Sequence, residues 1–288
     1  RVELNPRRRL LESLVSGYRE WGGTSSEPTI AILDWAGVPT QSEFYVLRDA
    51  FESLGYPALI ADPGELTFDG STVRVGDRTI DIVYKRVIIH EFLTQTDHTH
   101  ALTRAYGDGR IFMANSFRCK VAHKKASFAV LSDPRFEHLF TEEQIEIARA
   151  HVPWTRRVRE GIVDYSGEPV PMRDLLMTER KNLVLKPNDD YGGHGVTVGY
   201  ATDDETWQSV TEQAFSGSWI VQRRIPVRTE AVPHFDAAGR VEVSELTVDF
   251  DPFVFDGIVE GGMVRLSGTA LSNISAGGGE TAVAVIDV

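Results

Sequence analysis

The sequence is poor in cysteine, in lysine and in long apolar runs. One cysteine, Cys119, occurs in 288 residues, which excludes an intrachain disulfide framework and a zinc cluster built on cysteines. No apolar run approaches the ~20 residues that a membrane span needs, and residues 1–14 hold no hydrophobic stretch of the signal-peptide type. These absences predict a cytoplasmic protein with no membrane partner. The first residue is Arg1 rather than methionine, which is compatible with an upstream segment.

Positive charge is also scarce. The chain has 30 basic and 42 acidic residues, which gives a formal net charge of −12. We therefore expect no nucleic-acid partner, because binding to a phosphate backbone needs a basic surface. A small basic pocket for one phosphorylated ligand remains compatible with this balance. Only six of the basic residues are lysines, so a lysine in a glycine-rich loop stands out.

The first half of the chain alternates between strand and helix patterns. Apolar residues make up 42% of the chain and charged residues 25%. This composition is typical of a globular protein with a packed core. An amphipathic helix is expected over residues 10–18 and a polar linker over 22–28. Thr40 and Glu43 have the spacing of a capping box that opens the next helix. Strands are expected at 29–33, 58–61, 82–87 and 111–114, with a hairpin over 66–80. This order predicts a small α/β unit of Rossmann type.

From residue 117 the pattern changes and the last third becomes rich in strands. The expected elements are helices at 123–131, 141–150 and 203–215, and strands at 182–186, 196–199, 219–222, 241–250, 254–266 and 281–288. A second α/β unit closed by a mostly antiparallel sheet fits this order. The overall fold class is therefore α/β (α+β).

A lysine stands at the end of an apolar strand and is followed by a glycine-rich loop. Lys186 closes the strand at 182–186, and Gly192, Gly193 and Gly195 come within ten residues of it. Glycines let backbone N–H groups converge on a phosphate, and a lysine adds a mobile positive charge. No Gly-Lys-Ser/Thr run follows, so this is not a Walker A loop. A plain hairpin turn with a surface lysine is the alternative interpretation.

This run, residues 183–196, resembles the glycine-rich loop of ATP-grasp ligases. Residues 262–285 resemble the closing segment of circularly permuted members such as glutathione synthetase and glutathionylspermidine synthetase. There an arginine, here Arg265, precedes a small-residue loop that closes over nucleotide and substrate. The loop glycines of this chain are Gly277, Gly278 and Gly279.

The resemblance implies an ATP-grasp fold with permuted order. A strand and helix at 1–27 would belong to the nucleotide-binding domain, whose main part would be residues 117–288. Residues 28–116 would form a smaller Rossmann-like substrate-binding domain. Lys85 and Arg86 end a strand of that domain, where an open α/β sheet usually contacts its ligand. They would hold an acidic substrate or form a surface ion pair.

A magnesium site follows from the same resemblance. Residues 1–5 are similar to the Glu-x-Asn strand that binds magnesium in these ligases, and strand alternation puts Glu3 and Asn5 on one face. Asp190 matches an acidic metal ligand in the glutathione synthetase version of the glycine-rich loop. Such oxygen ligands suit a hard cation. The alternative for Asn5 is a helix N-cap with Pro6 as the first helical residue.

Two further segments resemble nucleotide contacts of the family. Lys125 is similar to the lysine at a helix start that contacts the α-phosphate region, with Lys124 as the fallback and a solvated helix end as the alternative. Residues 219–223 resemble the strand that passes the adenine, and Gln222 is the contact there. Arg223 stands where the family often has glutamate.

The resemblance implies an ATP- and Mg²⁺-dependent carboxylate–amine or carboxylate–thiol ligase. A substrate carboxylate would attack the γ-phosphate of ATP to give an acyl phosphate and ADP, and the amine would then displace phosphate. Lys186 and Arg265 would be the catalytic residues, because fixed cations stabilise the charge that spreads over the transferring oxygens. The partners would be a small carboxylic acid and an amine of amino-acid or peptide type.

Two other interpretations remain. A non-catalytic nucleotide-binding module on a degenerate ATP-grasp fold is favoured by Arg223 and by the short segment that follows Asn5. A cysteine hydrolase would instead pair Cys119 with His123, four residues later, as nucleophile and base. Separately, Glu245, Asp249 and Asp251 would form a carboxylate patch near the last sheet.

Overall fold

The computed structural model describes residues 4–235, 238–269 and 279–281. The chain forms two compact units: unit 1 comprises Arg1–Lys120, Pro252–Gly262 and Val283–Val288, and unit 2 comprises Val121–Asp251 and Met263–Ala282. Within the described ranges, no helix combines the length and apolar character that a bilayer crossing requires. Each unit is described by itself below.

Unit 1 is built on a four-stranded parallel sheet. Its strands are β1 (Ile30–Leu33), β2 (Ala58–Ala61), β6 (Ile82–Lys85) and β7 (Phe112–Ala114), in the order β2-β1-β6-β7. The connections contain α2 (Gln41–Ser53), η1 (Pro63–Glu65), an antiparallel meander of β3 (Leu66–Phe68), β4 (Val73–Val75) and β5 (Arg78–Ile80), then α3 (Ile89–Gln95) and α4 (Ala101–Gly107). Central β1 is buried along its length because helices cover both faces of the sheet. The predicted strands are confirmed, and the hairpin predicted over 66–80 is a meander of three strands.

Helix α1 (Pro6–Trp21) packs with α2 on one face of this sheet. The Asn5 side chain caps α1 by accepting from the Arg8 backbone N–H at 3.1 Å, and Gly22, at φ 107°, ends it. Residues 1–27 are predicted from the sequence to belong to the nucleotide-binding domain, whereas α1 shares the core of unit 1. The cause is its apolar face, which is buried there through Leu11, Leu14, Val15 and Tyr18.

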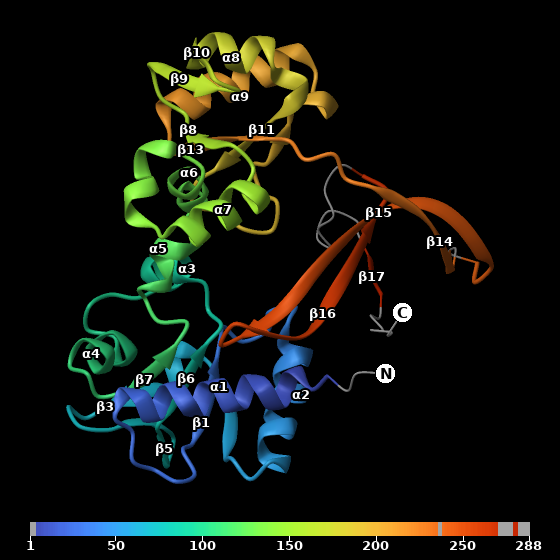
Figure 1. Cartoon of the computed structure of the whole chain (residues 1–288). Helices are drawn as coiled ribbons and strands as arrows, with labels where there is room; N and C mark the ends of the chain where they lie inside the picture. The colour runs from blue at the N-terminus through green and yellow to red at the C-terminus, as the bar shows by residue number, and fades with distance from the viewer. Residues whose placement is uncertain (1–3, 236–237, 270–278, 282–288) are drawn as a thin grey trace. The chain divides into compact units, whose positions relative to one another are not determined.

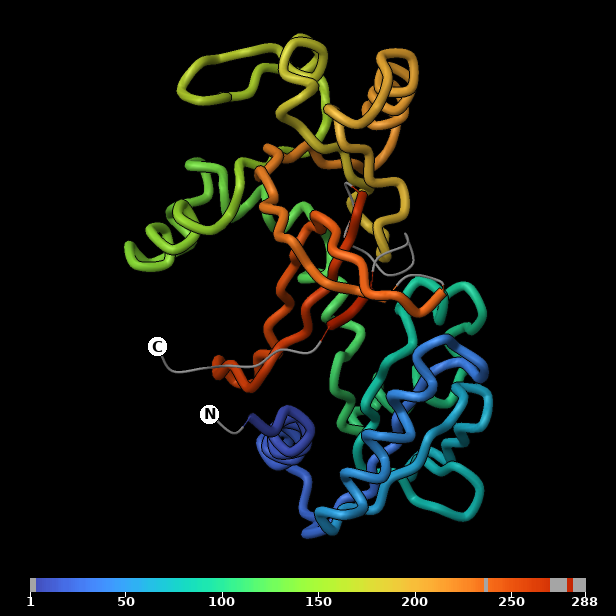
Figure 2. The backbone as a smooth tube through the Cα atoms, turned by 90° about the vertical axis from the view of Figure 1, so that its right-hand side faces the viewer, coloured from blue at the N-terminus to red at the C-terminus, as the bar shows by residue number. Residues whose placement is uncertain are grey.

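The tip of a long hairpin also belongs to unit 1. Strands β15 (Val241–Phe255) and β16 (Ile258–Ser267) meet at a two-residue turn in which Asp256 and Gly257 both have positive φ; their backbone can be followed in Figures 1 and 2. Glu260 pairs with Arg9 of α1 at 3.0 Å, and Asp256 accepts from Ser13 at 3.2 Å. The predicted break at 251–253 is wrong, because β15 runs through it.

Unit 2 contains an antiparallel sheet in the order β12-β11-β13-β8. These strands are β8 (Thr155–Arg157), β11 (Leu183–Pro187), β12 (Thr197–Val198) and β13 (Trp219–Arg223). Helices α8 (Met172–Thr178) and α9 (Asp204–Ser216) cover one face with the buried Trp207 at the centre of the core, and α6 (Ala126–Leu131) contacts β8 and β13 (Figure 1). The core fixes β11 and β13, whose ends carry the predicted lysine and glutamine.

The remaining elements of unit 2 lie around this sheet and in a second one. They are α5 (Cys119–His123), which begins in unit 1, η2 (Pro134–Leu139), α7 (Glu142–His151), the hairpin of β9 (Ile162–Tyr165) and β10 (Glu168–Pro171), η3 (Arg180–Asn182), η4 (Gly199–Ala201), and a sheet that orders β14 (Thr229–Phe235), β15, β16 and β17 (Gly279–Thr281). The helix predicted over 123–131 is broken at Lys124 and Lys125. Of the strand predicted over 281–288, only Thr281 falls within the described residues.

The two expected helix starts differ in their caps. Thr40 precedes α2 without a side-chain cap, and the Glu43 carboxylate pairs with Arg86 instead, so the predicted capping box is wrong. Thr141 and Gln144 form a complete box at α7, with reciprocal side-chain to backbone hydrogen bonds of 3.3 and 3.0 Å. Competition from a cationic partner explains why the first box does not form.

This contrast predicts different responses to threonine removal. Thr141→Ala should speed amide hydrogen exchange in the first turn of α7 about fivefold, because a lost N-cap costs ~1 kcal/mol. Thr40→Ala, the matched control, should leave exchange at the start of α2 unchanged within error. Mass spectrometry of peptic peptides measures both, and equal effects at the two sites would contradict the assigned caps.

Candidate functional site

Lys186 stands at one end of a polar row across the sheet of unit 2, with Gln222 at its centre. Its ammonium donates to Gln222 Oε1 at 2.7 Å, although the two residues are 36 positions apart. Gln222 Nε2 in turn donates to Thr155 Oγ1 at 2.9 Å. The register pairs Val184 with Gln222 and Gln222 with Thr155, which places the three polar side chains on one face of β11, β13 and β8. The structure thus brings two predicted nucleotide contacts together.

A second ammonium lies near the first. Lys125 Nζ donates to the Asp190 backbone carbonyl at 2.6 Å, beside the glycine-rich loop. Burial lowers the pKa of Lys186, and the positive charge of Lys125 lowers it further. Both causes disfavour the charged amine. A bound anion would remove this penalty, so the pair of lysines is an arrangement suited to a phosphate.

Asn188 sets the position of Lys125, and the sequence motifs did not indicate this role for Asn188. Its carbonyl accepts from the Lys125 backbone N–H at 3.0 Å, and its side-chain oxygen accepts from Ala126 N–H at 2.8 Å. Asn188 is itself buried and bonded twice to Ser218 at the start of β13. The available signal was an asparagine two positions after the strand lysine. Through these hydrogen bonds, Asn188 connects the start of α6 to the glycine-rich loop.

The loop between β11 and β12 needs its glycines. Gly192, Gly193 and Gly195 have φ values of 64°, 78° and 67°, in the left-handed region that other residues avoid. A Cβ atom on Gly195 would lie 2.6 Å from Pro187 Cγ. The predicted turn-rich conformation is therefore present, and its role in binding phosphate remains a prediction.

The magnesium ligands predicted from the sequence are not assembled by the described residues. Glu3 lies outside them, and the Asn5 side chain caps α1, which is the alternative interpretation given for it. Asp190 Oδ1 accepts from Tyr191 N–H at 2.8 Å and lies 3.8 Å from His194 Nδ1. No group of three or more histidine, cysteine or acidic side chains suited to a metal occurs in the described ranges. Asp190 stays a candidate, since magnesium takes few protein carboxylates beside phosphate oxygens.

Arg265 is held between two carboxylates of the neighbouring strand. Its guanidinium pairs with Asp249 at 2.5 Å and with Asp251 at 2.9 Å. These are two of the acidic residues that the sequence places near the last sheet. As an anion anchor, Arg265 would have to exchange one of these partners for the ligand. Gly279 begins β17 and pairs with Leu266, while Gly277 and Gly278 lie outside the described residues.

Arg223 faces away from the polar row. Its guanidinium stacks over the Tyr165 ring, 4.8 Å from the centroid, and donates to Ser166 at 2.6 Å in the β9–β10 hairpin. Successive strand residues point to opposite faces, so Arg223 does not displace Gln222 from its contact with Lys186. The presence of arginine rather than glutamate at position 223 therefore does not alter the face of β13 that carries Gln222.

The cysteine hydrolase interpretation gains no support. Cys119 Sγ contacts the Asn115 carbonyl at 3.6 Å, whereas His123 Nε2 lies 3.5 Å from Asp189. The fallback Lys124 also faces Asp189, at 3.7 Å. The thiol and the imidazole thus have different partners.

The two-lysine arrangement makes a titration prediction. Lys125→Met removes the repulsive charge and should raise the pKa of Lys186, so that less of its reactive neutral amine is present at mildly alkaline pH. Trace labelling with acetic anhydride, read by mass spectrometry across a pH series, measures this shift. Lys124→Met is the matched control and should leave the curve in place. An unchanged curve in Lys125→Met would contradict the proximity of the two ammonium groups.

Comparisons with known proteins bear on the fold. No protein-family model matches this sequence. A Frankia alni protein, provisionally named glutamate–cysteine ligase 2-3, is 26% identical over 273 residues, covering 88% of this chain and 29% of that protein. A Frankia casuarinae protein with the same provisional name, 2-2, is 24% identical over 274 residues, with the same coverage. The chain thus spans less than a third of the length of these relatives.

Two solved structures share its architecture. A glutathione synthetase-like effector from Globodera pallida, in its apo form, superposes with a TM-score of 0.54 at 12% identity, over 91% of this chain and 58% of that one. A D-cycloserine synthetase superposes with a TM-score of 0.50 at 15% identity, over 89% and 75%. At such identities the likeness concerns the fold alone. This chain therefore has the mixed α/β fold of the ATP-grasp class, as the sequence predicts.

Proposed function

We propose that this chain acts in an ATP- and Mg²⁺-dependent ligation of a small carboxylic acid to an amine or thiol. The observation that carries the proposal is the pair of ammonium groups, Lys186 and Lys125, beside a glycine-rich loop at the end of a buried strand. The names of the similar proteins support it, because each is a ligase or synthetase or is likened to one. The proposal also includes a circularly permuted order of the ATP-grasp motifs along this chain.

The nucleotide would be held by residues of unit 2. Lys186 and Lys125 would pair with its phosphates, backbone N–H groups of Gly192, Gly193 and Gly195 would line the loop, and Gln222 would face the base side of the strand. Magnesium, when bound, would neutralise negative charge on the phosphates. Asp190 is its candidate ligand within unit 2. Glu3, which lies outside the described residues, is a candidate by resemblance alone, and Asn5 is left out because its side chain caps α1. The donor set, few carboxylates with several cations, fits a metal that binds mainly through phosphate.

The bond changes balance without an added reagent. A carboxylate oxygen of the acid forms a bond to the γ-phosphorus of ATP while the bond from that phosphorus to the bridging oxygen breaks, and ADP leaves. The nitrogen of the amine then bonds to the acyl carbon, the carbon–oxygen bond to phosphate breaks, and the nitrogen loses a proton. Lys186 would stabilise the charge on the transferring oxygens, and Arg265 would orient the acyl phosphate. The Gly277–Gly279 segment would exclude water.

A nucleotide-binding module without catalysis is the second candidate. The Arg265 guanidinium is already paired with Asp249 and Asp251, and the Asn5 side chain is already used as a helix cap. In this alternative, the Arg265 guanidinium and the Asn5 side chain stabilise the fold and do not contact a substrate or a metal. Nucleotide binding without turnover on any acid would establish this alternative.

The ligase proposal predicts the products of the reaction. Incubation with ATP, Mg²⁺ and pooled amino acids should release ADP and phosphate, because the phosphoryl group is transferred before the amine attacks. Ion-pair chromatography of the nucleotides reads this directly. AMP with pyrophosphate would instead indicate an adenylated acid and would contradict the acyl-phosphate route.

The nucleotide site has its own test. Lys186→Met should weaken ATP binding about tenfold or more, since it removes a charged hydrogen-bond donor to phosphate. Lys181→Met changes an exposed lysine of η3 and is the matched control. Calorimetric titration measures both affinities, with circular dichroism to confirm folding. Unchanged affinity in a folded Lys186→Met would overturn the assignment of the loop.

A further inference from the structure

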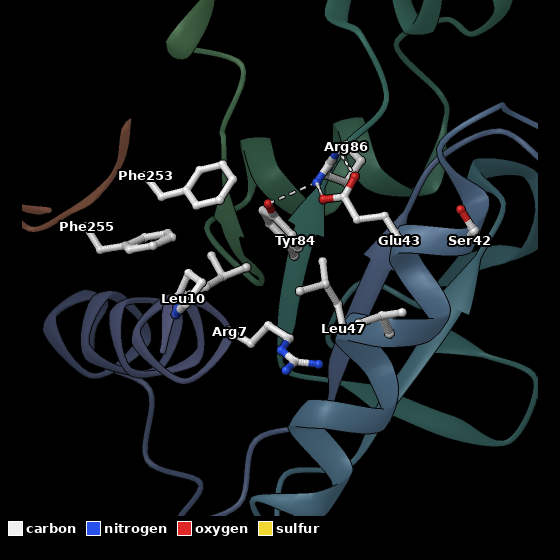
Figure 3. Close-up of a pocket in the computed structure, with 11 residues that line it drawn as sticks. Arg7, Leu10, Ser42, Glu43, Leu47, Tyr84, Arg86, Phe253 and Phe255 are labelled. Atoms are coloured by element: carbon white, nitrogen blue, oxygen red, sulfur yellow. Dashed lines mark hydrogen bonds and ion pairs between the residues drawn. The ribbon is translucent and has the colours of Figure 1, made fainter. Parts of the chain in front are cut away.

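Unit 1 contains an apolar pocket that the nucleotide site does not use. Its volume is about 690 Å³, within the range of small-molecule sites. Figure 3 shows Tyr84 on β6 with Leu10 and Leu47 to either side and with Phe253 and Phe255 of β15 opposite. Val46 and Phe253 keep 49% and 39% of their surface exposed. Burying them under a ligand would be favourable.

The pocket lies where an open parallel sheet places its ligands. The chain passes from β1 to β2 on one side and then returns to β6 on the other, so β1 and β6 flank the switch in strand order. Arg86 directly follows β6, and Glu43 lies in the first turn of α2, which follows β1. Both line the pocket. Ligands of such folds bind at the carboxyl ends of the strands at this switch point.

The polar part of the pocket contains the ion pair of Arg86 with Glu43, and the side chains of Arg7 and Ser42 also line it. Arg86 Nη1 and Nη2 donate to the two Glu43 oxygens at 2.7 and 3.0 Å, and Nη1 also donates to the Tyr84 hydroxyl at 3.3 Å. A guanidinium has five N–H groups, and these three hydrogen bonds leave two for a ligand. Lys85, the other cation predicted at this edge, is buried and donates to the Val87 carbonyl instead.

We propose that this pocket binds an apolar α-amino acid. The carboxylate of the amino acid would take the remaining donors of Arg86, its ammonium would pair with Glu43, and its side chain would lie among Leu10, Val46 and Phe253. A zwitterion matches the ion pair charge for charge, whereas a lone carboxylate or a lone amine satisfies half of it.

Binding at this pocket is independent of the nucleotide site, and only the role of the amino acid as a ligation substrate rests on the proposed function. The first test is calorimetric titration of the full chain, without nucleotide, with L-leucine and L-phenylalanine. Both should bind, while 4-methylpentanoate and 3-methylbutylamine, which each lack one of the two charges, should bind at least about tenfold more weakly. The inference is overturned if neither amino acid binds, or if either half-molecule binds as well as leucine.

Variants locate the site. Glu43→Gln removes the partner of the ammonium, and Val46→Glu puts a charge on an exposed wall; each should weaken leucine binding about tenfold or more. Arg48→Gln, on the same helix and paired with Asp49, should leave it unchanged. Leucine binding that survives both pocket variants would overturn the assignment. Two outcomes with the unaltered chain separate the proposals. If the chain releases ADP but does not bind leucine, only the pocket inference is refuted. If it binds leucine but releases no ADP, only the ligase proposal is refuted.

Discussion

The candidate nucleotide site depends on one partly buried positive charge, the ammonium of Lys186. Burying Lys186 opposes its protonation, and Lys125 opposes it further. Because its folded pKa lies below the unfolded value, the charged lysine destabilises the fold at neutral pH, and the penalty is relieved only as pH rises through the folded pKa towards the unfolded one. Gln222 and Thr155 hold the ammonium in place without supplying a compensating charge. A phosphate would bring a charge opposite to that of both ammonium groups, and the proposed nucleotide binding rests on this arrangement.

The frame around that charge follows from packing. The core of unit 2, centred on Trp207, fixes β11 and β13 in register, and Asn188 ties the start of α6 to the loop that follows β11. In unit 1, tertiary contacts likewise form the apolar pocket. The Glu260–Arg9 ion pair and the contact of Asp256 with Ser13 dock the hairpin tip on α1. This docking brings the β15 phenylalanines to a sheet that is distant in sequence.

Local patterns predicted much of the fold and less of the site. Periodicity and turn residues located the parallel strands and α1, and the strand–lysine–glycine order located Lys186 and its loop. The pattern at Thr40 failed because Arg86, 43 residues from Glu43, competes for its carboxylate. Residues 152–181 were left without elements, since their strands are short and carry little alternation. Asn188 and the pairing of Arg265 arise from tertiary contacts that no single segment encodes.

The most direct test of the central claim is the titration of the lysine side-chain amines themselves. With only six lysines, ¹⁵N-labelled Nζ resonances can be assigned by substitution and followed against pH with and without ATP. We predict that ATP raises the pKa of Lys186, because the phosphate anion stabilises its charged form. Saturating ATP that leaves the pKa of Lys186 where it is in the free protein would contradict the proposal.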